Sequence, residues 1–189
     1  IFQQSSCGGS ALSDITGLTG TSYNYTAPSE ATYSFQLVTI DNAGNQSAAS
    51  ACSTDIIIDL TSPTAVSGLK TPADNATDGD AIFDDDITIY FAWDFTDDGT
   101  GSGVQSYTLK RYDESNCGGA STDTTGISNI INSQSFDGVG GTTYSFEVTA
   151  IDGAGNSSTS ACSTDITIDL INPTEASTFE ISSITAIYS

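Results

Sequence analysis

Apolar and polar residues alternate with a period of two in two stretches near the C-terminal end of the chain, residues 144–150 and 166–170. This alternation is typical of half-buried β-strands. Between them, Asp152–Asn156 is rich in Asp, Gly and Asn, which favour tight turns. The pattern predicts a strand, a turn and a Ser/Thr-rich segment that leads to a second strand. The apolar positions are Tyr144, Phe146, Val148 and Ala150 in the first stretch and Ile166, Ile168 and Leu170 in the second.

The same pattern occurs once more, earlier in the chain. Each of four landmarks of the later copy, Cys117, Cys162, Asp169 and Pro173, has a counterpart 110 positions upstream, at Cys7, Cys52, Asp59 and Pro63. A period of this length fits a β-sandwich domain in a tandem array better than a solenoid unit. We therefore interpret residues 1–60 as the C-terminal half of one copy and residues 61–170 as a complete copy. Residues 171–189 would be a linker and the first strand of a following segment.

Five more strands are expected in the complete copy, within or around residues 65–71, 87–95, 104–112, 127–131 and 133–136. No stretch has helical periodicity. The positions expected to face inward on the second and third of these strands are Ile87, Ile89, Phe91, Trp93, Phe95, Tyr107 and Leu109. Tyr90 and Tyr112 are expected to face outward, and Phe179 and Ile181 share one face of the strand expected in the tail.

The chain is strongly acidic, with 24 Asp and Glu against 3 Lys and Arg and a formal net charge of −21. A basic patch for nucleic acid cannot be built from three basic residues, and an anionic membrane surface would repel the chain. No apolar run is long enough to span a bilayer, so we expect no membrane insertion of this segment. The charge either serves solubility alone or reflects aspartates that hold metal.

Four cysteines occur, Cys7, Cys52, Cys117 and Cys162. The spacing is 45 positions in both copies, which favours one pair within each copy, although four cysteines allow three connectivities. No Cys-x-x-Cys motif and no His is present, so a zinc site is not expected. Disulfides indicate an oxidising compartment, and we expect an extracellular or cell-surface location.

Aromatic residues and turns together resemble a known family. Trp93, Tyr107 and Tyr144, with the segments Thr96–Val104 and Ala150–Asn156, resemble the tandem fibronectin type III and Ig-like repeats of bacterial surface proteins and large adhesins. Ile168–Thr174, repeated as Ile58–Thr64, is similar to the linker between such repeats. The resemblance implies an all-β fold, with tandem fibronectin type III/Ig-like β-sandwich domains in a linear array. The expected core consists of Trp93, Tyr107, Tyr144, Phe146 and Val148.

Several acidic residues are candidates for calcium binding. In the expected sandwich, the turn after the second strand and the turn of the last hairpin lie at the pole that the linker enters. Calcium takes six to eight oxygen ligands from such turns. The candidate ligands are Asp59, Asp97, Asp98, Asp152 and Asn156. The alternative is that Asp and Asn simply occupy turns that they favour. A second acidic run, with Asp78, Asp80, Asp84, Asp85 and Asp86, is expected to be a solvated loop.

No catalytic constellation is found, and without His a Ser-His-Asp or Cys-His arrangement cannot be built. We expect a non-enzymatic, structural or adhesive segment of an extracellular repeat protein, such as a stalk, fibre or adhesin. Its partners would be neighbouring repeats of the same chain, other copies in a fibre, or a cell-surface ligand. Two alternatives stay open: a module that binds carbohydrate or a host protein, and a filament subunit assembled by strand donation.

Overall fold

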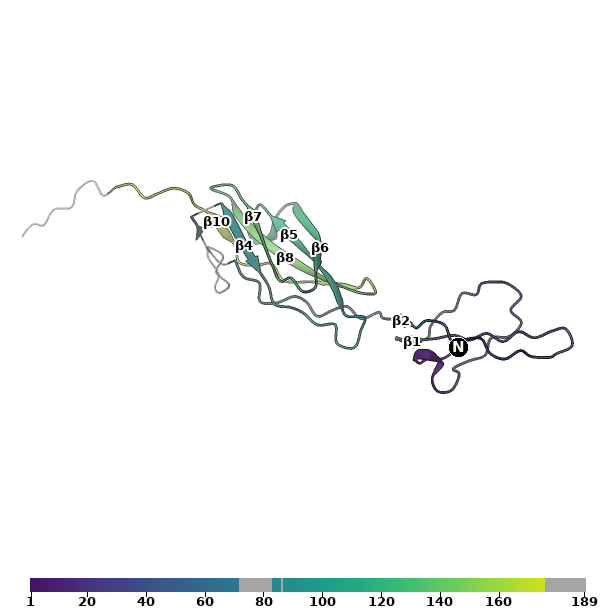
Figure 1. The fold of residues 1–189 in the computed structure, drawn as a ribbon. Coiled ribbons are helices and arrows are strands. Elements are labelled where there is room, and N and C mark those ends of the chain that lie inside the picture. The colour runs from purple at the N-terminus through teal and green to yellow at the C-terminus, as the bar shows by residue number, and fades with distance from the viewer. Residues whose placement is uncertain (72–82, 86, 176–189) are drawn as a thin grey trace, which may run out of the picture.

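The computed structural model describes residues 1–71, 83–85 and 87–175. In this part of the chain the regular elements are β-strands and two short 3₁₀ turns, η1 (Ser5–Cys7) and η2 (Ser115–Cys117). Figure 1 shows an N-terminal part and a β-sandwich arranged end to end. The strands are β1 (Ala31–Tyr33), β2 (Ile56–Ile58), β3 (Phe83–Asp84), β4 (Thr88–Ala92), β5 (Val104–Tyr112), β6 (Ser121–Ser128), β7 (Ser133–Asp137), β8 (Thr143–Asp152), β9 (Ser157–Thr159) and β10 (Ile166–Ile168).

Two sheets form the sandwich. The larger has the order β3-β10-β8-β5-β6, with β9 also beside β8, and its pairs are antiparallel except for β3 with β10. The smaller joins β4 to β7, and the backbone at Lys70 pairs with Ala92 of β4. Two mainly antiparallel sheets packed face to face make an all-β sandwich of the fibronectin type III/Ig-like class, as the sequence predicts.

The core lies between the two sheets and is centred on β8. All five expected core residues, Trp93, Tyr107, Tyr144, Phe146 and Val148, are buried in one cluster. The ring of Trp93 lies 5.7 Å from that of Tyr107, and Phe91 stacks on Phe146 with ring centroids 4.4 Å apart. The period-two alternation of β8 therefore indicated the correct face.

Some strand ends differ from the sequence prediction. The expected strand over residues 87–95 is shorter, since β4 ends at Ala92, and its outer positions Ile87 and Phe95 are exposed. Leu170, expected to face inward, is also exposed because β10 ends at Ile168. These apolar residues continue the alternation beyond the strand ends without being buried.

The prediction from sequence was also wrong for the bounds of β6 and for the exposure of two side chains. The strand expected over residues 127–131 spans Ser121–Ser128, and only Ile127 of this polar strand is buried. Tyr112, expected to face outward, is buried, and its hydroxyl donates to Glu147 at 2.7 Å. Asp84, expected in a solvated loop, is buried in β3, where its carbonyl accepts the Asp169 N–H. Asp78, Asp80, Asp86, Phe179 and Ile181 lie outside the described residues.

Each copy contains one disulfide. Cys7 is joined to Cys52 and Cys117 to Cys162, each with a Cα–Cα distance of 5.9 Å, which is the pairing that the equal spacing favours. A buried serine positions the first cysteine in both copies. The Cys117 N–H donates to Ser145 Oγ at 2.7 Å, and the Cys7 N–H donates to Ser34 Oγ at 2.9 Å.

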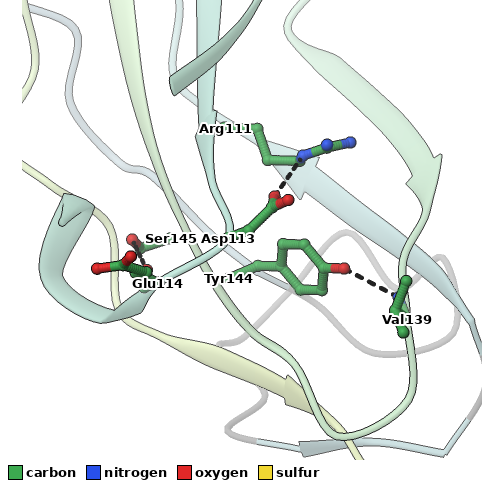
Figure 2. A network of polar contacts seen from close by, with 6 residues as sticks. All are labelled: Arg111, Asp113, Glu114, Val139, Tyr144 and Ser145. Atoms are coloured by element: carbon green, nitrogen blue, oxygen red, sulfur yellow. Dashed lines mark hydrogen bonds and ion pairs between the residues drawn. The ribbon is translucent and has the colours of Figure 1, made fainter. Parts of the chain in front are cut away.

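One serine of β8, Ser145, fixes the η2 turn to this strand, because its hydroxyl both accepts and donates a hydrogen bond. Figure 2 shows Ser145 at the base of this turn, where its hydroxyl donates to the Glu114 carbonyl at 2.7 Å. On the same strand, the hydroxyl of the core residue Tyr144 accepts the Val139 N–H at 2.9 Å (Figure 2). Arg111, on the neighbouring β5, pairs with Asp113 at 3.0 Å. These contacts anchor the loops at the end of the sandwich far from the linker.

A serine ladder brings the second cysteine of each copy into reach. We use this name for Ser160 and Ser163 beside β8 and for Ser47, Ser50 and Ser53 in the first copy. Each of these serines donates its backbone N–H to the neighbouring segment and accepts an N–H from the same residue of that segment with its hydroxyl. Such contacts recur every third residue, so the segment runs beside its neighbour without regular period-two pairing.

The N-terminal part is only partly covered. Its two strands, β1 and β2, pair antiparallel, and Tyr33 is buried against Tyr25. Several apolar side chains nevertheless face solvent: Leu37, Val38, Ile40, Ile56 and Ile57. Leu37 corresponds to the fully buried Val148 of the second copy. The described residues of the first copy provide one face of a sandwich, without a second sheet against it.

Candidate functional site

Three carboxylates from distant parts of the chain meet where the linker reaches the sandwich. Asp59 belongs to the linker after β2, Asp98 to the turn between β4 and β5, and Asp152 to the end of β8. One oxygen from each lies within 4.8 Å of the others, and all three residues are buried, with exposed fractions of 8%, 6% and 0%. We call these three residues the junction triad.

Asp152 organises the turn between β8 and β9. Its Oδ1 accepts the N–H groups of Ala154 and Asn156 at 2.9 and 2.8 Å. Asp41 makes the same two bonds to Ala43 and Asn45 in the first copy. Asp therefore stands at this position in both copies for a local reason, because its side chain completes the turn. That bonding leaves carboxylate lone pairs free toward the junction.

Asp59 and Asp98 are held by a single short loop. Ser102 donates its N–H to Asp59 Oδ2 at 2.6 Å, and Gly103 donates its N–H to Asp98 Oδ2 at 2.8 Å. The Ser102 side chain and then its backbone N–H lower the pKa of the Asp59 carboxyl. The loop thus favours the charged form of the linker residue.

Gly101 lies directly against both carboxylates. A Cβ atom at this position would overlap the Asp98 carboxylate and would lie 2.8 Å from Asp59 Oδ2. A side chain here would therefore force the two carboxylates apart. The close approach, and not an unusual backbone angle, makes glycine necessary.

Asn156 and its neighbours fix the linker to the sandwich. The Asn156 Nδ2 atom donates to the carbonyls of Asp59 and Thr61 at 3.1 and 3.3 Å and to Asp152 Oδ2 at 2.9 Å. Further along the linker, Ser158 Oγ donates to the Pro63 carbonyl at 2.6 Å. The linker is therefore docked onto the sandwich and does not pass it as a free tether.

The structure gathers most of the candidate ligands named from the sequence. Asp59, Asp98 and Asp152 form the triad, and Asn156 adjoins it through its amide. Asp97 lies outside it, since its side chain is exposed and its Oδ1 accepts the Gly99 N–H at 3.1 Å. Gly101 and Ser102 were not anticipated. The two glycines of Gly101-Ser102-Gly103 are a sequence signal for close backbone approach, which the prediction of a turn alone does not use.

The triad offers oxygen atoms only, which are the donors that hard cations take. Within the described part of the chain, no ion pair involves any of its three members. In the same residues, no helix has the length and hydrophobicity that crossing a bilayer requires.

Comparison with known proteins identifies similar solved structures. No protein-family model and no curated protein matches the chain. Among the similar structures is an Fn3-like protein from Clostridium thermocellum, 23% identical, which covers 60% of this chain and 100% of its own with a TM-score of 0.40. The FN1–FN3 domains of chicken CNTN1 are 18% identical over 76% of this chain and 45% of theirs, with a TM-score of 0.42. The fn3 domain of human collagen alpha-1(XX) chain is 19% identical over 61% and 93%, with a TM-score of 0.38.

Proposed function

We propose that this chain is a spacer segment of an extracellular repeat protein, in which β-sandwich domains follow one another in line and set distance and stiffness. The observation that carries the proposal is the repetition of one construction. Both copies have a disulfide that spans 45 positions, a serine ladder beside the equivalent segment and an Asp-led turn at the same place. A repeated unit of this kind suits a protein that extends by adding domains.

The docked linker supports a stiff connection. Besides the Asn156 and Ser158 contacts, the Thr64 N–H donates to the Asp97 carbonyl at 2.9 Å. These hydrogen bonds, spread over residues 59–64, restrict the angle between the two parts, which lie end to end (Figure 1). A free hinge would lack such contacts.

The proposed location is outside the cell. Two disulfides form, and disulfides persist in oxidising compartments. The partners proposed are neighbouring repeats of the same chain, with other copies in a fibre or a surface ligand at its tip. A binding role through exposed aromatic side chains is weakened because Tyr112, one of the two tyrosines expected to face outward, is buried.

Distance measurement between labels on the two parts tests the spacer proposal. With one spin label in residues 1–60 and one in residues 104–152, we expect a narrow distance distribution by double electron–electron resonance. Asn156→Ala should broaden it, because it removes the bonds to Asp59 and Thr61. Asn45→Ala is the matched control, since Asn45 donates to Asp41 of its own turn at 2.8 Å and, among the described residues, makes no hydrogen bond to the linker. A broad distribution in the unmodified chain would contradict a stiff spacer.

A further inference from the structure

We propose that the junction triad, Asp59, Asp98 and Asp152, binds one calcium ion and thereby fastens the linker to the sandwich. This inference goes beyond the spacer function and does not depend on it. A domain could act as a spacer without metal, and a calcium site could serve another function.

The first observation is the convergence of the three carboxylates. Their oxygens lie within 4.8 Å of one another. Oxygens on opposite sides of a calcium ion are separated by at most twice the bond length of about 2.4 Å, so one oxygen from each member of the triad is close enough to share a single calcium ion. The three residues come from three segments, and two of these, around Asp98 and Asp152, are more than 50 positions apart in the sequence.

The second observation is an oxygen that has no partner. Asp98 is only 6% exposed, and its Oδ1 atom is buried without a hydrogen-bond donor among the described residues. A buried carboxylate oxygen normally accepts at least one hydrogen bond or coordinates a metal. Here the oxygen lies close to the carboxylates of Asp59 and Asp152, whose negative charges repel it. A cation is the partner that this oxygen lacks.

Backbone N–H groups orient the triad toward a common point. Ser102 and Thr61 hold Asp59, Gly103 holds Asp98, and Ala154 holds Asp152. Each donor fixes one carboxylate while the remaining lone pairs stay available. Metal ligands are typically oriented in this way by the groups behind them. Asn156 acts as such a positioning residue, because its amide nitrogen donates to Asp152 and to the linker.

The donor set favours calcium over other metals. All four cysteines are in disulfides and no His is present, so soft and borderline ions lack their preferred ligands. Magnesium demands near-ideal octahedral geometry and keeps several waters, whereas calcium accepts irregular sites with six to eight oxygens. The residues that correspond to Asp152 and Asp59 elsewhere in the repeat do not form a second site. Asp41 in the first copy and Asp169 after β10 are both exposed, so one ion per chain is expected.

Calorimetric titration of the full chain with calcium chloride tests the site. After removal of metal with a chelator, we expect one calcium per chain with a Kd on the order of 10⁻⁴–10⁻³ M, the range of extracellular modules. The melting temperature should rise with calcium at matched ionic strength, since only the folded chain assembles the site. Magnesium at the same concentration should raise it less.

Asp98→Asn and Asp97→Asn form a matched pair. Both remove one negative charge, at adjacent positions. Asp98→Asn should weaken calcium binding at least about tenfold, which is the smallest effect usual even for groups behind the ligands. Asp97→Asn should leave it unchanged, because Asp97 is exposed and outside the triad. Asp98→Asn should melt no lower than the unmodified chain in chelator, since it relieves repulsion.

A variant that leaves the net charge unchanged distinguishes calcium binding at the triad from a general attraction of cations to the acidic chain. Gly101→Ala should lower calcium affinity without changing charge, and Gly20→Ala is its control, because a Cβ at Gly20 has no neighbour closer than 3.7 Å. Equal melting curves in calcium and chelator for the unmodified chain would overturn the proposal. Equal losses in Asp97→Asn and Asp98→Asn would also overturn it, because binding would then follow net charge. The first result uses the unmodified chain alone, and the melting curves of the two Asp variants in chelator show that both are folded before their losses are compared.

Discussion

At the scale of single residues, side-chain oxygens replace missing backbone partners. Ser160 is the clearest case: its hydroxyl accepts the buried Val148 N–H at 3.0 Å, in the centre of the core strand β8. A regular strand would offer a carbonyl there. The segment after β9 is irregular, and the serine supplies the acceptor instead.

Replacing Ser160 by Ala should therefore destabilise the sandwich by about 1–3 kcal/mol, the cost of a buried donor left without a partner. Denaturant titration of the intact chain measures the change. Ser157→Ala, at an exposed position of β9, should cost less than about 0.5 kcal/mol. If both variants unfold at the same denaturant concentration, the hydroxyl has no such role.

Tyr112 and Glu147 form a second polar contact inside the large sheet. The phenol donates to Glu147 Oε2, and this hydrogen bond, followed by burial and the nearby negative charges, raises the pKa of Tyr112 to about 12. An unfolded tyrosine ionises near pH 10. Because the folded state holds the proton more tightly, this contact stabilises the fold fully below pH 10. Its contribution falls as the pH rises from about 10 to about 12.

Glu147→Gln should lower the pKa of Tyr112 toward 10 and shift the onset of its ionisation to lower pH. Resonances of the Tyr112 ring, followed by NMR through an alkaline titration, report the midpoint directly. Asp113→Asn, which alters a charge that is not among the causes of the shift, is the control. A midpoint near 10 in the unmodified chain would show that the contact with Glu147 is not maintained.

At the scale of elements, the disulfide and the serine ladder act together. Cys117–Cys162 joins the η2 turn to the segment that runs beside β8, and the ladder places that segment within reach. In a chain-entropy account, a closed loop of this size restricts the unfolded chain more than the folded one.

Replacing both Cys117 and Cys162 by Ser should lower the free energy of unfolding by about 4 kcal/mol. Changing both residues avoids an unpaired thiol. Equilibrium unfolding in denaturant, with the Cys7 and Cys52 pair left intact, gives the value. A decrease below about 1 kcal/mol would mean that the loop is already restricted in the unfolded chain.

The repeat, the hydrophobic alternation and the cysteine spacing carried enough information to predict the sandwich and its core. The predicted strands are too long because Ile87, Phe95 and Leu170 continue an apolar pattern beyond the ends of β4 and β10. Strand β6 was misplaced because its polar residues show no alternation. Of the junction, the acidic residues were visible in the sequence. The contacts of Gly101 and Ser102 with the triad depend on how the linker docks onto the sandwich, which no local sequence pattern encodes.

At the scale of the whole molecule, the two copies make the same hydrogen bonds in different surroundings. The Leu37 N–H donates to Ser50 Oγ at 3.1 Å in the first copy, as Val148 does to Ser160 in the second. Leu37 is 66% exposed, whereas Val148 is fully buried beneath the second sheet. The comparison isolates the effect of burial on otherwise equivalent bonds.

Hydrogen exchange followed by mass spectrometry should show the difference. Amides of residues 35–50 should exchange faster than the equivalent amides of residues 146–160, because opening the first copy exposes little additional apolar surface. The comparison is internal to one sample, so pH and temperature are matched. Equal protection in the two segments would mean that the hydrogen bonds alone, and not the cover of a second sheet, determine local stability.

The serine ladder also has a consequence for how such copies avoid pairing with each other. Similar sequences held close together are prone to edge-to-edge strand pairing and domain swapping. A segment that meets its neighbour at every third residue turns its N–H and C=O groups progressively around its axis. We therefore expect its outer side to lack the straight row of groups that an incoming period-two strand requires. On this basis the serines that complete β8 should also protect the edge of the sheet against aggregation.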